Sequence, residues 1–253
     1  MASTRLQNAV KALLLIGMGL FLLSRVVSGT LYYYINERFA VLTVIAIFGL
    51  ILLGVSYRMV RDDHDHEDHA GHDHGHDHHH HGLTWAGAAL VAVPIVLGFA
   101  VPARPLGAAA MANREVNVEL RGSAMPAAVR SATAKPAGEK NILDWFHLLR
   151  ASADPVQEFA GQEAKVTGFV YRDDRFGADQ FMVTRYTVSC CVADASVVGL
   201  VVRWPGAADL PLDQWVEVSG PFVADTFAGE PYPILAADAL TETGIPSQPY
   251  LFP

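Results

Sequence analysis

The sequence predicts an α-helical membrane part followed by a small all-β domain. Apolar residues form long blocks before residue 101, whereas apolar and polar residues alternate after residue 164. Hydrophobic residues make up 51% of the chain and charged residues only 17%, against about a quarter in a typical soluble protein. This deficit of charge indicates that lipid surrounds part of the chain. The formal net charge of −8 and the scattered basic residues argue against a nucleic-acid partner.

Three apolar blocks, at 10–27, 39–57 and 83–101, have about the length that crosses a hydrocarbon core of roughly 30 Å. The first block carries Lys11 and Arg25 only near its ends, where long side chains reach the polar interface. The sequence therefore predicts a transmembrane region over 1–101 with about three helices. A cleaved signal peptide is the alternative for the first block, and a buried or re-entrant segment is the alternative for the third.

The orientation of these helices is weakly encoded, because basic residues near the membrane are almost equally divided between the two sides. The basic residues of the first helix lie mainly at its start, which favours a cytoplasmic N-terminus. With three spans we expect a multi-pass protein of the cell membrane whose C-terminal domain lies outside the cytoplasm.

A segment rich in histidine and aspartate, residues 62–82, separates the second and third blocks. It has no apolar residue larger than alanine, so it predicts a flexible loop. Imidazole is a good ligand for zinc, nickel and copper, and neighbouring carboxylates add oxygen ligands. We interpret the loop as several weak, exchanging metal sites that buffer, sense or deliver an ion; a polar spacer is the alternative. The candidate ligands are His64, His66, His69, His72, His74, His76, His78, His79, His80 and His81.

The stretch 102–140 is rich in Ala, Pro, Gly and Ser and predicts a flexible linker. Residues 141–150 then predict a short amphipathic helix, with Asn141 as its N-cap.

Five segments with a period of two follow this helix, the fourth with a break at Gly220 and Pro221. We therefore expect a soluble OB-like domain over 141–253, a five-stranded barrel preceded by a short helix. A β-sandwich topology is the alternative. The expected strands are 164–173, 180–191, 196–204, 214–225 and 232–242.

Cys190 and Cys191 are the only two cysteines, and they end the second expected strand. Adjacent side chains on a regular strand point to opposite faces, so both thiols serve one site only where the chain bulges or turns. Residues 193–195, Ala-Asp-Ala, are typical of such a turn. Two thiolates with Asp194 would then suit a soft or borderline metal. The alternative is one buried core cysteine beside an incidental neighbour.

Several segments together resemble the YcgQ-like family of bacterial permease subunits, and the resemblance extends over nearly the whole chain. The most specific is CCVADA at 190–195, where the family commonly reads Cys-Cys-Ala-Ala-Asp-Ala and this chain has Val192 in the third place. The resemblance implies an accessory membrane protein that acts with a separate multi-span permease. The other segments are the apolar helices, the His/Asp loop, PLGAAAMANR (105–114), GFVYRD (168–173) and GLVVRW (199–204).

These observations lead to the expectation of a non-enzymatic accessory subunit of a membrane transport system that binds or delivers a transition metal such as zinc, with no organic cofactor. Motifs of hydrolases and nucleotide-binding enzymes, such as GxSxG, HExxH and the P-loop, do not occur. Two alternatives stay open. One is a membrane-anchored β module that binds a protein or envelope partner without metal, and the other is a thiol-redox enzyme, which the lack of a CxxC motif disfavours.

Overall fold

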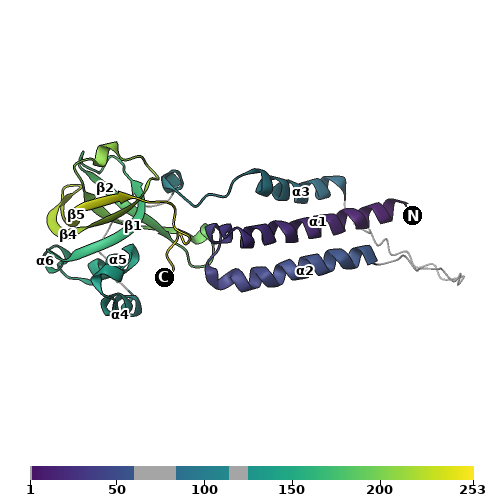
Figure 1. Cartoon of the computed structure of the whole chain (residues 1–253), viewed down its shortest axis with the longest axis horizontal. Coiled ribbons are helices and arrows are strands. Elements are labelled where there is room, and N and C mark those ends of the chain that lie inside the picture. The colour runs from purple at the N-terminus through teal and green to yellow at the C-terminus, as the bar shows by residue number, and fades with distance from the viewer. Residues whose placement is uncertain (1, 60–83, 114–124) are drawn as a thin grey trace, which may run out of the picture. The chain divides into compact units, whose positions relative to one another are not determined.

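A computed structural model describes residues 2–59, 84–113 and 125–253, and the chain divides into two compact units (Figure 1). The first unit comprises Met1–Leu31 and Glu37–Arg104, and the second comprises Tyr32–Asn36 and Pro105–Pro253. Residues 32–36, in the connection between the first two helices, therefore belong to the second unit.

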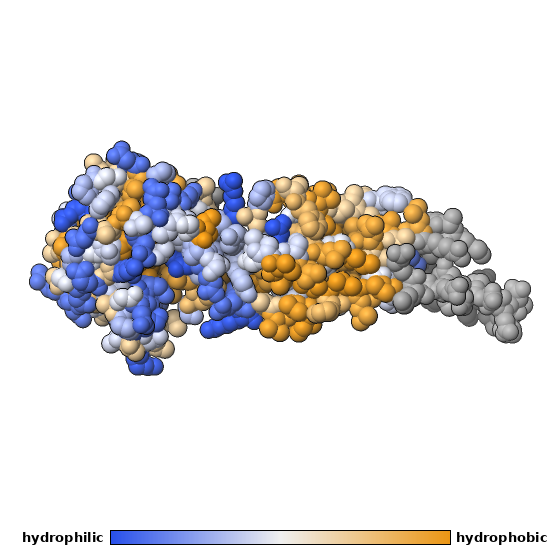
Figure 2. Space-filling model, in the orientation of Figure 1, coloured by the Kyte–Doolittle hydropathy of each residue, from blue (hydrophilic) through white to orange (hydrophobic). Residues whose placement is uncertain are grey.

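The first unit contains three apolar helices, α1 (Ala2–Val27), α2 (Ala40–Met59) and α3 (Trp85–Ala100). The segments Leu6–Val27 and Glu37–Tyr57 are long and apolar enough to cross a membrane, with mean hydropathies of 2.0 and 2.7. Their large apolar side chains are mostly exposed, and Figure 2 shows the resulting apolar surface. A surface of this kind suits contact with lipid rather than with water.

Glycine lets α1 and α2 approach each other closely. A Cβ atom on Gly19 would lie 2.9 Å from Cγ1 of Ile51, and a Cβ atom on Gly54 would lie 2.7 Å from Cγ1 of Ile16. Small residues at such contacts are typical of helices that pack within a bilayer.

The third apolar helix is shorter than the other two. Thr84 caps it, because the Thr84 hydroxyl accepts a hydrogen bond of 3.1 Å from the Gly87 amide. Its 16 residues extend over about 24 Å at ~1.5 Å per residue. The apolar block predicted at 83–101 thus forms a helix that lacks the length of α1 and α2.

The second unit is built on one six-stranded sheet in the order β1-β2-β3-β5-β4-β6. The β1 strand also pairs with β4, so the pairings among the first five strands return to β1. All pairs are antiparallel except β3 with β5. The strands are β1 (Glu163–Tyr171), β2 (Gln180–Thr187), β3 (Ser196–Arg203), β4 (Trp215–Phe227), β5 (Glu230–Ala236) and β6 (Ala239–Glu242).

The fourth and fifth of the expected strands differ from the structure, and so does the end of the second, beside the cysteines. The segment 232–242 forms two strands, because the Ala237 amide donates to Arg203 O at 3.1 Å and the Asp238 amide to Ser219 O at 2.9 Å. Arg203 ends β3, and Ser219 lies in the part of β4 that pairs with β6 rather than with β5, so the partner along β4 changes from β5 to β6 at these residues. In addition, β4 runs unbroken through residues 220–221, where a break was expected.

The helix predicted at 141–150 is confirmed as α5 (Ile142–Ala151). The Asn141 side chain accepts from the Asp144 amide at 3.0 Å, and the Asp144 carboxylate accepts from the Asn141 amide at 2.9 Å, which forms a capping box. Its apolar face packs on the sheet, where Ile142 and Leu149 are fully buried. The short helix α6 (Pro155–Glu158) follows.

The segment expected to be a flexible linker, 102–140, contains regular structure in its described parts. A 3₁₀ helix (Ala108–Asn113), α4 (Pro126–Ala134) and a second 3₁₀ turn (Ala137–Glu139) lie within it. Met111 is only 2% exposed and belongs to a core cluster with Tyr186, whose hydroxyl donates to Gly107 O at 2.9 Å. Residues 105–113 are therefore an integral part of the second unit, which is called the β unit below.

Candidate metal centre

Cys190 and Cys191 lie in the loop that joins β2 to β3. The β2 strand ends at Thr187, so the expected extension of this strand to residue 191 is wrong. A short 3₁₀ turn, Val192–Asp194, follows the cysteines directly, and the turn predicted from residues 193–195 is confirmed. Because the chain has left the strand, the two side chains need not point to opposite faces.

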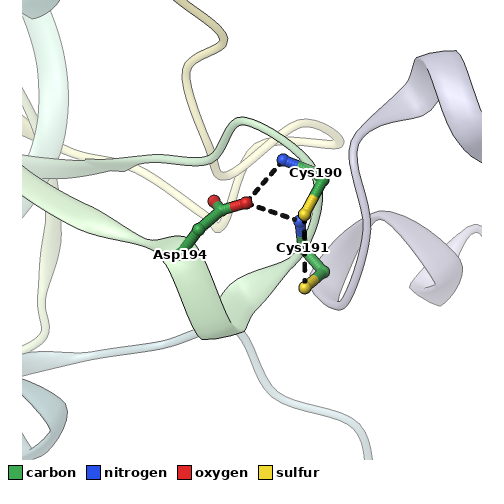
Figure 3. Close-up of side chains that lie close together, drawn as sticks. All are labelled: Cys190, Cys191 and Asp194. Carbon is green, nitrogen blue, oxygen red and sulfur yellow. Dashed lines mark hydrogen bonds between the residues drawn. The ribbon is translucent and has the colours of Figure 1, made fainter.

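The Asp194 carboxylate organises this loop from the inside (Figure 3). Its Oδ1 accepts from the Ser189 amide at 2.8 Å, while Oδ2 accepts from the amides of Cys190 at 2.7 Å and Cys191 at 3.2 Å. The interaction with the Cys190 side chain, together with these amide bonds, lowers the pKa of Asp194 to about 2. Asp194 is therefore ionised at neutral pH and holds the backbone of both cysteines.

The sulfur atoms are placed to share one ion. The Sγ atoms of Cys190 and Cys191 are 3.6 Å apart, and these atoms lie within 4.8 Å of a carboxylate oxygen of Asp194. Two thiolates on a tetrahedral zinc ion, with Zn–S bonds of about 2.3 Å, are separated by about 3.8 Å, whereas a linear two-coordinate ion needs about 4.6 Å. The observed separation of the two sulfur atoms is close to the value for a tetrahedral ion.

Charge at this loop favours a cation. Hydrogen bonds of the Cys190 thiol with the Asp194 carboxylate, and then with Cys191, raise the pKa of Cys190 to about 11, because they stabilise the protonated thiol. A bound divalent cation would compensate the carboxylate and the thiolates together. Cys190 is exposed and Cys191 half-buried, so an ion can reach the sulfur atoms.

The cysteine loop is hydrogen-bonded to residues 34–36, which are distant from it in sequence. Ile35 forms an antiparallel bridge with Cys191, and the Asn36 amide donates to Cys190 O at 2.9 Å. The Val192 amide donates to Tyr34 O at 3.0 Å. Sequence reasoning missed this contact, since residues 34–36 were assigned only to the transmembrane region over 1–101. The sole signal was a polar asparagine between two apolar blocks.

The histidine candidates, from His64 to His81, lie outside the described residues. Within the described ranges, Cys190, Cys191 and Asp194 form the group whose ligand atoms could hold a metal. The structure therefore brings together the three ligands predicted on the β domain and does not test those in the loop.

Protein-family models match both the N-terminal and the C-terminal part of the chain. Residues 10–117 match the model of the DUF1980 N-terminal domain, and residues 129–253 match the model of the DUF1980 C-terminal domain. The chain belongs to the DUF1980 family. Cys190, Cys191 and Asp194 lie in the C-terminal domain of the family, and the connection 32–36 lies in the N-terminal one. The contact described above thus joins the two DUF1980 domains.

The UPF0703 protein YcgQ of Bacillus subtilis (strain 168) is 25% identical to this DUF1980 protein over 99 residues. The match covers 38% of this chain and 34% of YcgQ, so it spans about a third of that relative. This similarity supports the resemblance to the YcgQ-like family. No solved structure matches the chain.

Proposed function

We propose that this protein is a non-enzymatic, membrane-anchored accessory subunit of a transport system and binds zinc, or another divalent transition metal, at Cys190, Cys191 and Asp194. The observation that carries the proposal is the 3.6 Å separation of the two sulfur atoms in a loop that Asp194 holds through three amide bonds. Two thiolates and a carboxylate are a suitable ligand set for zinc.

Three local ligands leave one position of a tetrahedral ion open. An ion held in this way at an exposed loop can pass to another ligand, which suits delivery better than permanent storage. The partner would be a separate multi-span permease, as the resemblance to the YcgQ-like family implies. The His/Asp-rich segment 62–82 would collect or buffer the same ion.

We propose that the β unit is a closed, OB-like barrel. The support is the ring of pairings from β1 through β2, β3, β5 and β4 back to β1, with α5 packed on the sheet. The sixth strand extends this arrangement along one side of β4.

The pairing of residues 34–36 with the cysteine loop also supports a membrane topology. If α1 and α2 each cross the membrane, the connection between them faces the side opposite to residues 60–83. The cysteine loop shares the side of this connection, because the two are hydrogen-bonded. The β unit follows α3 in the chain, so α3 must cross as well. We therefore propose three crossings, with the thiols and the His/Asp-rich segment on opposite faces. The cytoplasmic N-terminus that the basic residues of the first helix favour would then place the thiols outside the cytoplasm.

Labelling of right-side-out membrane vesicles tests this topology. Cys190 and Cys191 are the only cysteines, so a membrane-impermeant maleimide, added after treatment with a chelator, reports on them alone. We expect labelling without permeabilisation. A matched Cys190→Ser/Cys191→Ser/Gly82→Cys variant should be labelled only after permeabilisation. Labelling of both proteins under the same condition would contradict three crossings.

The metal proposal is tested on the full-length chain in detergent with residues 62–82 replaced by a Gly/Ser linker of equal length, which removes the loop histidines. After reduction and dialysis against zinc, we expect one bound zinc ion per chain by elemental analysis. A folded protein that retains no zinc would reject the metal role of the β domain and favour a module that binds a protein partner.

A further inference from the structure

We propose that the connection between α1 and α2 is a working part of the thiol site, with Asn36 as its positioning residue, so that occupation of the site by a metal and the conformation of this connection control each other. The proposal rests on the metal role of Cys190 and Cys191 and adds to it the element that responds to the ion.

Asn36 is the residue that ties the connection to the site. It is 2% exposed, and its Nδ2 donates to Ser189 O at 3.0 Å and to Val188 O at 3.4 Å. These carbonyl groups directly precede the cysteines, while the Asn36 amide bonds to Cys190 O. A buried amide side chain that satisfies neighbouring carbonyl groups fixes their orientation, because breaking such bonds leaves buried polar groups unpaired.

A second contact, made by Tyr250, holds the connection at Tyr33. The Tyr250 hydroxyl donates to Tyr33 O at 3.2 Å and accepts from the Leu106 amide at 2.8 Å. Tyr250 itself is 2% exposed and packs in the core cluster of the β unit. The connection therefore lies between a rigid core residue and the cysteine loop, and the loop is the side that a ligand can alter.

The distance along the chain from the site to a membrane helix is short. The 3₁₀ turn Glu37–Phe39 follows Asn36, and α2 begins at Ala40. The start of α2 is thus separated from Asn36 by only three residues of chain. By linkage, an element that improves metal binding must itself be stabilised by the metal to the same degree.

Hydrogen exchange tests this coupling without a change at the thiol site or at Asn36. The full-length protein with the Gly/Ser linker is compared with and without saturating zinc. We expect exchange of the peptide that covers residues 32–36 to slow about tenfold, while a peptide from β6 stays unchanged. Unchanged exchange at 32–36, in a protein that binds zinc, would overturn the coupling and leave the metal role intact.

Variants of Asn36 supply the reciprocal measurement. Loss of a residue that orients metal ligands typically weakens binding 10–100-fold, so we expect Asn36→Ala to weaken zinc binding about tenfold. Asn36→Asp keeps the shape of the side chain but places a carboxylate oxygen against the carbonyl groups of Val188 and Ser189. It should weaken zinc binding by at least as much. Asn141→Ala removes a capping asparagine of the same unit and should lower stability without changing zinc affinity.

The outcomes separate the two proposals. Loss of zinc binding in Cys190→Ser/Cys191→Ser together with wild-type affinity in both Asn36 variants would overturn the role of Asn36 alone. A chain with the Gly/Ser linker and an unchanged thiol site that binds no zinc would overturn the metal role, and the coupling with it.

Discussion

Replacement of both cysteines, Cys190→Ser/Cys191→Ser, is expected to weaken zinc binding by at least about 100-fold in the chain with the Gly/Ser linker. Serine cannot supply the thiolate that zinc prefers, and two of the three local ligands are lost together. The fold should survive, because Cys190 is exposed and Cys191 half-buried, and the backbone bonds to Asp194 do not involve the sulfur atoms.

Cobalt substitution gives this prediction a spectroscopic check. The wild-type protein should show thiolate-to-cobalt charge-transfer absorption, each single variant a reduced band, and the double variant none. Ser196→Ala, at the other end of the same loop, is the matched control and should bind as the wild type does. Equal zinc affinity in the double variant and the wild type would place any metal site elsewhere.

Zinc binding at this loop should also depend steeply on pH. The pKa of Cys190 is raised to about 11 by Asp194 and Cys191, so the thiol is protonated at neutral pH and must lose its proton to bind the ion. Affinity should therefore rise with pH, by up to about tenfold per pH unit for each thiol that is deprotonated. A flat profile between pH 6 and 8 would indicate that thiolates do not ligate the metal.

The sequence predicts those features that depend on local pattern. The capping of α5 by Asn141 follows from the residue types at its start, and the turn after the cysteines follows from residues 193–195. The ends of strands are less well encoded, because β5 stops where the amides of Ala237 and Asp238 bond to strands distant in sequence.

Features that depend on tertiary contacts could not be predicted in the same way. Asn36 bonds to carbonyl groups 152 and 153 residues away, and no periodicity marks it. Met111 lies in a stretch of small residues that is typical of a linker, yet it is buried against the β unit. Asp194 was expected as a metal ligand from its type, but its three amide bonds show that it also builds the loop.

Gly220→Ala is expected to destabilise the β unit by about 3 kcal/mol, at the upper end of the range for overpacking a core. Gly220 lies in β4 between residues 216–219, which pair with β6, and residues 222–227, which pair with β5. A Cβ atom here would overlap with Ala236 O and lie 3.0 Å from the Asp238 amide nitrogen.

The backbone that such a Cβ atom meets cannot move away freely. The Ala237 amide bonds to Arg203 O on β3, and the Asp238 amide bonds to Ser219 O on β4 itself. Relief of the overlap must therefore break pairing at the junction of three strands. This constraint also explains why position 220 of a continuous strand is occupied by glycine.

Thermal unfolding in detergent, followed by tryptophan fluorescence, measures the effect. For a unit of this size 3 kcal/mol corresponds to roughly 10 °C in Tm. Gly244→Ala is the matched control, because a Cβ atom there meets no other atom within 4 Å, and its effect should stay within about 0.5 kcal/mol. If Gly220→Ala unfolded at the wild-type temperature, the close passage of β4 over the β5–β6 junction would be incorrect, and with it the ring of pairings that supports the OB-like barrel.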